Sequence, residues 1–158
     1  MQLYVIRHGI AEDSNPAGEA ARELTSEGRK KLKKSIRGLR ELGASFDRVL
    51  TSPWARALAT ATMLEALCDA PPVITDLLAQ PPRAELLALI AERGQDTAVV
   101  GHEPWLSELV AWLTVGEQRR GDAIDLRKGG VIRLDGEAIP HGMKLQAHLP
   151  PKVLRALA

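Results

Sequence analysis

The chain has 158 residues, 45% of them hydrophobic and only 3% aromatic, so it can bury one aliphatic core. A formal net charge of +1 gives no indication that the chain binds nucleic acid or an anionic membrane through its overall charge. The only cysteine, Cys68, excludes an intramolecular disulfide and fits a reducing compartment. Without a signal-peptide pattern or an apolar run long enough to cross a bilayer, we expect a single cytoplasmic domain over residues 1–158.

An apolar strand is predicted at Leu3–Ile6, and it ends in the polar tripeptide Arg7-His8-Gly9. A buried strand has no internal use for Arg-His, so both side chains are expected where the strand leaves the sheet. Gly9 lets the backbone turn tightly and lets a ligand approach it closely. Three residues alone are equally explained by a strand that stops at a polar turn, so their meaning depends on the rest of the chain.

The segment 10–24 is polar and is predicted to be a loop, and a helix is predicted over 25–42. Leu32, Ile36 and Leu39 recur at helical spacing and define its buried face. The same helix carries a run of basic residues: Arg29, Lys30, Lys31, Lys33, Lys34, Arg37 and Arg40. We interpret this run as a solvated face, with a docking surface for an acidic partner as the alternative.

Strands and helices alternate along the rest of the chain. Strands are predicted at 46–50, 73–74 and 97–101, and helices at 53–67, 84–93 and 104–113. Ser52 and Pro53 form a helix-start signal as N-cap and first helical residue. After a polar connection, two closing strands at 130–134 and 143–147 are expected as a hairpin around Asp135-Gly136, followed by a short helical tail. The alternation predicts an α/β fold, a three-layer α/β/α sandwich around a mostly parallel sheet.

Polar side chains follow three of these strands. Arg7 and His8 follow the first, Arg56 lies in the helix after the second, and His102 follows the strand at 97–101. Because the carboxyl ends of parallel strands share one edge, we expect these four side chains to converge. Two arginines and two histidines repel one another unless an anion lies among them, and the planar guanidinium suits phosphate. A neutral imidazole is also a competent nucleophile, so the cluster predicts a phosphoryl-transfer site.

Two other kinds of site fit the residues less well. Two histidines can ligate zinc, but the nearby arginines oppose a metal ion and no His-x-x-x-His or Glu-x-x-His spacing occurs. A Ser-His-Asp hydrolase lacks its Gly-x-Ser-x-Gly turn. We take His141 and His148 as surface or loop residues. Packing is the expected role of Trp54 and Trp105, with the rim of the phosphoryl site as the alternative.

Four segments together resemble the signature of a known family. These are Arg7-His8-Gly9, Arg22-x-Leu24-Thr25-x-x-Gly28, Ser52-Pro53-x-x-Arg56-Ala57-x-x-Thr60-Ala61 and Gly101-His102-x-Pro104. They resemble, in order, the motifs of the histidine phosphatase superfamily, which has the phosphoglycerate mutase-like fold. The short chain and Lys-Gly-Gly-Val at 128–131 look most like the branch that contains SixA-type protein phosphohistidine phosphatases.

The resemblance implies a role for each of the four site residues. His8 would be the nucleophile and would become phosphohistidine. Arg7 and Arg56 would bind the phosphoryl oxygens, and His102 would contact the same oxygens and stabilise the transition state. Water would then hydrolyse the intermediate, and neither a metal nor an organic cofactor is implied.

The chain departs from the family pattern at the position of a polar ligand and at the general acid. Many members carry an Asn six residues after the nucleophile, where this chain has Ser14, which we keep as a candidate substrate-binding residue. Glu85 is the nearest candidate for the acid by position, and Glu12 and Asp13 in the loop are the others. Phosphohistidine needs little acid help because its leaving nitrogen can be protonated beforehand, which favours a phosphoramidate substrate.

Three functions follow from these observations. The first is a phosphatase acting on protein phosphohistidine, with a role in signal transduction. The second is a small-molecule phosphomonoesterase or a phosphoglycerate mutase-like enzyme, and the third is a non-catalytic phosphate-binding module. The expected partners are a phosphorylated protein or a small phosphorylated molecule, and a phosphate or sulfate ion is expected to bind the site.

Overall fold

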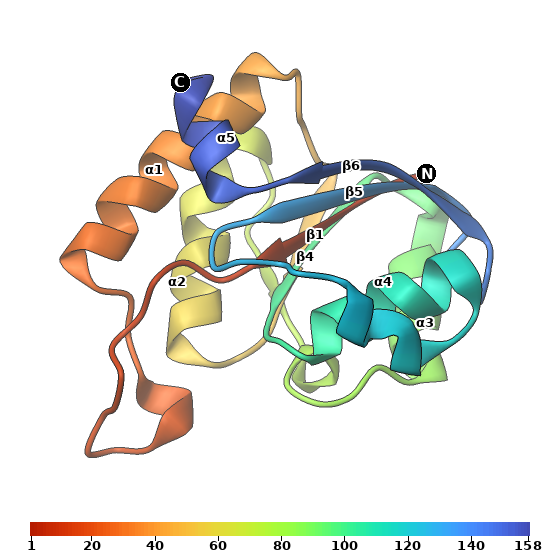
Figure 1. Ribbon diagram of the computed structural model, residues 1–158, viewed down its shortest axis with the longest axis horizontal. Helices are drawn as coiled ribbons and strands as arrows, with labels where there is room; N and C mark the ends of the chain where they lie inside the picture. Colours follow the sequence, from red (N-terminus) through yellow and green to blue (C-terminus); the bar gives the residue numbers. More distant parts are fainter.

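The computed structural model describes residues 1–158, built around a six-stranded sheet in the order β3-β2-β4-β1-β5-β6 (Figure 1). Four strands are parallel: β1 (Gln2–Arg7), β2 (Arg48–Thr51), β3 (Val73–Ile74) and β4 (Thr97–Gly101). Two antiparallel strands extend the sheet beyond β1: β5 (Val131–Gly136) and β6 (Met143–Leu149). The mostly parallel sheet confirms the predicted fold class.

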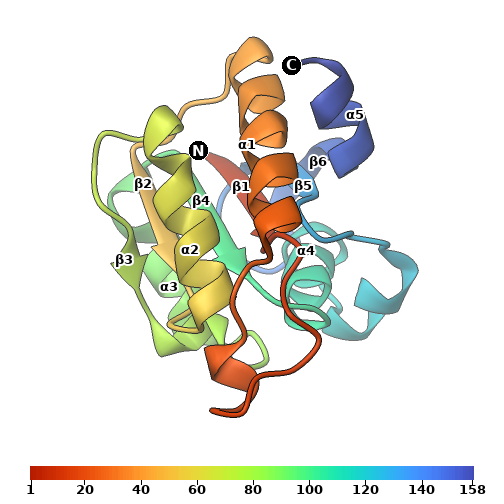
Figure 2. The same ribbon diagram turned by 90° about the vertical axis from the view of Figure 1, so that its left-hand side faces the viewer.

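Helices cover both faces of the sheet (Figures 1 and 2). One face carries α1 (Ser26–Glu41), α2 (Ala55–Met63) and α5 (Pro151–Ala156), and the other carries α3 (Ala84–Ala91) and α4 (Trp105–Val115). Short 3-10 helices join these elements: η1 (Glu19–Ala21), η2 (Leu64–Leu67), η3 (Asp76–Leu78), η4 (Glu92–Gly94) and η5 (Gln118–Ala123). None of the helices combines the length and apolar character needed to cross a membrane.

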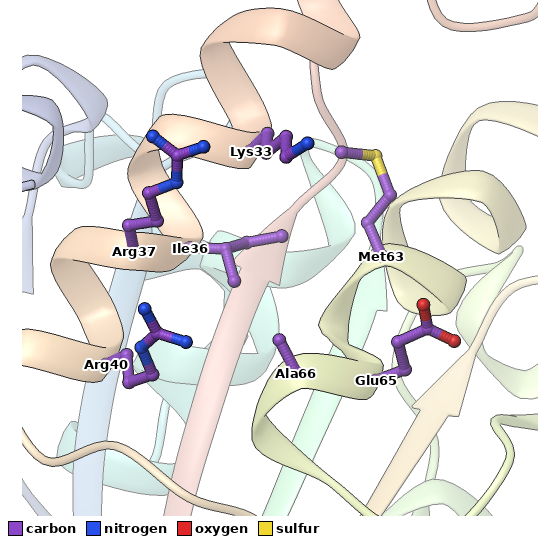
Figure 3. Close-up of a pocket in the computed structure, with 7 residues that line it drawn as sticks. All are labelled: Lys33, Ile36, Arg37, Arg40, Met63, Glu65 and Ala66. Carbon is purple, nitrogen blue, oxygen red and sulfur yellow. The ribbon is translucent and has the colours of Figure 1, made fainter.

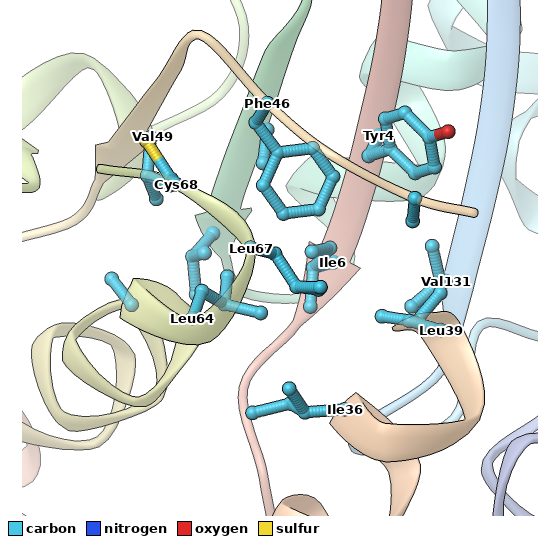
Figure 4. Packing of buried hydrophobic residues seen from close by; sticks show 14 of the residues in the cluster. Tyr4, Ile6, Ile36, Leu39, Phe46, Val49, Leu64, Leu67, Cys68 and Val131 are labelled. Atoms are coloured by element: carbon cyan, nitrogen blue, oxygen red, sulfur yellow. The ribbon is translucent and has the colours of Figure 1, made fainter. Parts of the chain in front are cut away.

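The strand β1 supplies side chains to two hydrophobic clusters, one on each face of the sheet. Tyr4 and Ile6 join a cluster of 18 buried residues beneath α1 and α2 (Figure 4). Leu3 and Val5 join a cluster of 17 on the opposite face. Each fully buried Leu or Ile contributes about 1.5–3 kcal/mol, and the near-equal clusters explain why the strands are apolar throughout.

The helix predicted over 25–42 is confirmed as α1. Thr25 caps its start, since the backbone N–H of Gly28 donates to the Thr25 hydroxyl oxygen at 2.9 Å. Its buried stripe includes Leu32 and Leu39, as the spacing predicts. The cap places the first turn of α1 against the loop that follows β1, where the Thr25 N–H donates to the carbonyl of Ile10 at 3.0 Å.

The predicted start of the second helix is wrong by two residues. The helix α2 begins at Ala55, with Trp54 as its N-cap in an extended conformation. The Ser52 hydroxyl accepts the Trp54 N–H at 3.1 Å and lies 2.8 Å from Nε2 of His102. Ser52 is therefore hydrogen-bonded to His102, a residue distant in sequence, and the local sequence does not predict this contact.

The predicted hairpin has its turn in a different place. Asp135 and Gly136 pair with Lys144 and Met143 within the sheet. The connection therefore spans 137–142. The segment predicted as a loop, 10–24, is mostly irregular, with η1 inside it and a single bridge between Ala11 and Leu24.

Candidate active site

The four residues predicted to converge at the ends of the strands line one pocket of about 360 Å³. Arg7 ends β1, His8 follows it, Arg56 lies in the first turn of α2, and His102 comes directly after β4. The strands β1, β4 and β2 are adjacent and parallel, so their carboxyl ends meet at one edge of the sheet. The remaining residues that line the pocket are Glu19, Arg22, Trp54, Glu103, Trp105 and Lys128.

The buried side chain of His8 presents an unprotonated nitrogen to this pocket. Its Nδ1 lies 2.7 Å from the carbonyl oxygen of Gly9, which only accepts, so Nδ1 carries the proton. Nε2 then holds the lone pair and accepts a hydrogen bond from Nε of Arg56 at 3.2 Å. Burial, and then the charges of Arg56 and Arg7, lower the pKa of His8 to about 4, despite an opposing contribution from the bond to Gly9. The imidazole is therefore neutral at neutral pH.

The second histidine, His102, lies against the first, with ring centroids 5.3 Å apart. Its Nε2 is bonded to the Ser52 hydroxyl, and its Nδ1 is buried with no partner in the protein. The Trp54 ring packs against it at 4.4 Å between centroids. Burial, followed by the charges of His8 and Arg56, lowers the pKa of His102 to about 3. Leaving a buried polar nitrogen without a hydrogen-bond partner costs free energy. Such a nitrogen is expected at a binding site, where a ligand supplies the missing partner.

The two arginines hold positive charge beside these neutral rings. Arg7 donates from Nη1 to the carbonyl of Leu126 at 3.0 Å, whereas its buried Nε has no partner. Arg56 donates from Nη1 to the Glu19 carbonyl at 2.8 Å and from Nη2 to the Glu19 carboxylate at 2.9 Å. Burial lowers the pKa of both guanidinium groups, yet arginine stays charged in proteins. The pocket is therefore built to bind an anion.

Glu19 is one of two pocket carboxylates that the sequence interpretation missed, the other being Glu103. Glu19 lies on η1, inside the segment predicted as a loop, and its carboxylate accepts from Arg56 and, at 2.7 Å, from Nη1 of Arg22. The bond from Arg22 is the main reason why the pKa of this carboxyl is below its usual range. Arg22 and Lys128 occur in the sequence segments that resemble the family, but no role in the site was predicted for them. No local sequence pattern predicts Glu19 as a site residue, because only the path of the loop brings it next to the arginines.

Four residues considered from the sequence lie outside the lining of the pocket: Ser14, Glu12, Asp13 and Glu85. The Glu12 carboxylate instead holds its own loop together, accepting from Asn15 at 3.1 Å and from the Glu23 N–H at 2.9 Å. Glu85 is exposed in the first turn of α3, where an acid favours the helix dipole. None of the four side chains lines the pocket, so the pocket geometry gives no support to Ser14 as a substrate ligand or to the three candidate acids, and these roles stay predictions.

Glu103 is the only other carboxylate in the pocket lining. Its two oxygens accept hydrogen bonds from Ser107, one from the backbone N–H at 2.8 Å and one from the hydroxyl. Both Glu103 oxygens are therefore engaged within the protein. With Glu19 paired to arginines, neither carboxyl group in the pocket lining is left without a partner. Nor does any group of three or more His, Cys, Asp or Glu side chains converge to hold a metal ion.

Comparison with known proteins gives a consistent picture. A model of the histidine phosphatase superfamily (branch 1) matches residues 3–80. An uncharacterized protein of Picosynechococcus sp. is 36% identical over 157 residues, covering 94% of this chain and 90% of that protein.

Two solved structures show the shared fold at low identity. The protein histidine phosphatase SixA complexed with tungstate superposes with a TM-score of 0.80 at 24% identity, over 98% of this chain and 99% of that one. A phosphoserine phosphatase from Entamoeba histolytica, in complex with 3-phosphoglyceric acid, has a TM-score of 0.74 at 16% identity, over 97% and 98% of the two chains.

Proposed function

This chain belongs to the histidine phosphatase superfamily, and on that premise we propose that it is a phosphatase that acts through a covalent phosphohistidine on His8. The observation that carries the proposal is the unprotonated Nε2 of a neutral, buried His8 beside two arginines, one of which donates a hydrogen bond to it. A nucleophile must be unprotonated, and a phosphoryl group needs cations around its oxygens. The pocket supplies both at once.

In the first step, the phosphoryl oxygens bind the two buried nitrogens of the pocket that lack partners: Nε of Arg7, and Nδ1 of His102 in the tautomer that carries its proton there. Nε2 of His8 attacks phosphorus, the new P–N bond forms, and the bond to the leaving group breaks with its electron pair. The Arg56 N–H that bonds Nε2 in the free protein is then released to a phosphoryl oxygen. Three donors thereby stabilise the charge that develops on those oxygens.

In the second step, water attacks the phosphorus of phosphohistidine. The P–N bond breaks, its electron pair returns to Nε2 of His8, and the water proton leaves with the inorganic phosphate. The bond from Nδ1 to the Gly9 carbonyl keeps the ring in one orientation through both steps.

The proposed substrate is phosphohistidine in a protein. Both carboxyl groups of the pocket lining are engaged within the protein, which supports this choice, because a leaving imidazole nitrogen can be protonated beforehand whereas an alkoxide needs an acid. Trp54 and Trp105, whose ring centroids are 5.9 Å apart, form an aromatic wall against which an imidazole can pack. Such an activity would belong to signal transduction.

A small phosphorylated molecule is the second candidate substrate. The shared fold with a phosphoserine phosphatase that binds 3-phosphoglyceric acid favours it. Arg22 and Lys128 in the pocket lining also offer cations to a second acidic group on such a molecule.

The test combines phosphoenzyme trapping with a substrate panel. Turnover of a histidine-phosphorylated protein should leave an acid-labile, alkali-stable phosphate on His8, and kcat/KM should exceed that for phosphoserine or 3-phosphoglycerate. His8→Ala should abolish turnover, whereas His141→Asn, an exposed histidine outside the pocket, should not. Undiminished turnover by His8→Ala would refute the nucleophile, and a preference for the esters would refute the substrate.

A further inference from the structure

A second hollow, which we call the α1 groove, lies between α1 and the end of α2 (Figure 3). It has a volume of about 380 Å³, and its lining residues are Lys33, Ile36, Arg37, Arg40, Met63, Glu65 and Ala66. Arg56 of the catalytic pocket is in the first turn of α2, whereas Met63 ends that helix, about 10 Å further along its axis. The α1 groove is therefore separate from the catalytic pocket and shares no residue with it.

One wall of the α1 groove is a stripe of unpaired cations. Lys33, Arg37 and Arg40 are spaced i, i+4 and i+7, so they share one face of α1 and span about 10 Å. All three are exposed, and none forms an ion pair or a side-chain hydrogen bond. The single ion pair within α1 joins Lys31 to Glu27. These three cations do not stabilise α1, because like charges at adjacent positions on one helix face repel one another.

The floor of the α1 groove is apolar, and its far wall is acidic. Ile36 and Met63 belong to or pack against the buried cluster under α1, and Ala66 lies beside them. Glu65 stands opposite the cations (Figure 3). A nucleic acid or polyphosphate has no apolar face to pack on the floor of the groove. An apolar floor beside a row of cations matches a protein segment that carries both apolar and acidic side chains.

We propose that the α1 groove docks an acidic amphipathic helix of a partner protein. The apolar side of that helix packs on Met63 and Ala66, which are partly or fully exposed, above the buried Ile36, and methionine adapts readily to different apolar surfaces. Carboxylates spaced i, i+4 and i+7 on the partner match the spacing of Lys33, Arg37 and Arg40. The inference does not depend on the reaction proposed above, and docking leaves the catalytic pocket open.

The experiment uses the full chain and a synthetic helical peptide of about 18 residues, long enough to hold a helix. The peptide carries Glu at i, i+4 and i+7 beside a row of Leu and Met. In an NMR titration, the amide shifts should concentrate at Ile36, Met63 and Ala66, and the affinity should fall as salt rises. No shifts, or shifts spread over the whole basic surface of α1, would overturn the docking site.

Matched variants separate docking from general charge attraction. Arg37→Glu/Arg40→Glu should weaken peptide binding by about tenfold or more, since two attractive pairs become repulsive. Lys30→Glu/Lys34→Glu makes the same charge change on exposed residues outside the groove and should have a much smaller effect. Equal losses in the two pairs would overturn the proposal. If the Glu pair impairs folding, Arg37→Gln/Arg40→Gln takes its place with the same expected ranking.

The apolar floor has its own test. Met63→Gln removes apolar contact without changing charge, and it should weaken the peptide several-fold if the helix lies in the groove. Unchanged affinity would mean that charge alone binds the peptide, and the proposal would fail.

Discussion

At the scale of single residues, the contact with Ser52 predicts which nitrogen of His102 carries a proton. Its hydroxyl oxygen accepts the Trp54 N–H and lies 2.8 Å from Nε2 of His102. The Ser52 hydroxyl forms no other hydrogen bond, so donation to Nε2 is the arrangement that gives its proton an acceptor. We therefore predict that the imidazole proton sits on Nδ1, the buried nitrogen that has no partner in the protein.

Replacing this hydroxyl tests the arrangement. Ser52→Ala should lower kcat by about 10–100-fold, the usual range when a group that orients a histidine is lost. The 15N shifts of the His102 ring should report an unprotonated Nε2 in the parent protein and a mixture of tautomers in the variant. A parent ring protonated on Nε2 would contradict the assignment.

Glu19 sets the affinity of the pocket for anions. Its carboxylate neutralises Arg56 and Arg22, so it competes with any phosphoryl group for the same donors. Glu19→Gln should therefore lower the Ki of phosphate or tungstate by about 3–10-fold, while kcat falls because Arg56 is less firmly oriented. The matched control is Glu23→Gln, which removes an equal charge from an exposed neighbouring residue. An unchanged Ki in Glu19→Gln would refute the competition.

At the scale of elements, α1 packs through two glycines against two different neighbours. A Cβ at Gly28 would collide with the carbonyl of Ile10, in the loop after His8. A Cβ at Gly38 would collide with the carbonyl of Leu154 in α5. One glycine thus joins α1 to the active site, and the other joins it to the end of the chain.

The two glycines give a matched pair of variants. Gly28→Ala and Gly38→Ala should each cost about 1–3 kcal/mol of unfolding free energy, because the backbone must move to admit the methyl group. Only Gly28→Ala should also lower kcat/KM, since it displaces the loop that holds His8. Urea unfolding and steady-state kinetics measure the two effects. Equal activity losses in both variants would mean that the displacement is not local.

The elements differ in how well a sequence predicts them, for physical reasons. Local signals determine α1, namely a Thr25 cap and an apolar stripe, and its range was predicted closely. The start of α2 was missed because a bond to His102 draws Ser52 out of the capping role. The convergence of Arg7, His8, Arg56 and His102 followed from parallel-strand topology, which places every strand end at one edge. Glu19 arrives through an irregular loop, whose path has no periodic signature.

At the scale of the whole molecule, the fold holds two neutral histidines against positive charge. His8 and His102 are both almost fully buried, at 4% and 3% exposure. Their pKa values, about 4 and about 3, lie well below the ordinary value of 6.5 that the unfolded chain restores. Protonating either ring in the folded protein places another cation beside Arg7 and Arg56. The site therefore makes the stability of the whole chain depend on pH.

The direction of that dependence follows from proton linkage. As the pH falls from 6.5 towards 4, the unfolded chain binds protons on both residues while the folded chain does not. The free energy of unfolding should therefore decrease with falling pH, by up to about 2.7 kcal/mol per pH unit if both sites contribute fully. Urea unfolding between pH 5 and pH 7 measures how steeply the free energy of unfolding depends on pH.

The double variant His8→Asn/His102→Asn should reduce this pH dependence in the same window. The control His141→Asn/His148→Asn, at exposed positions, should leave it unchanged. If the His8/His102 variant kept the full slope, the acid sensitivity would have to arise outside the pocket.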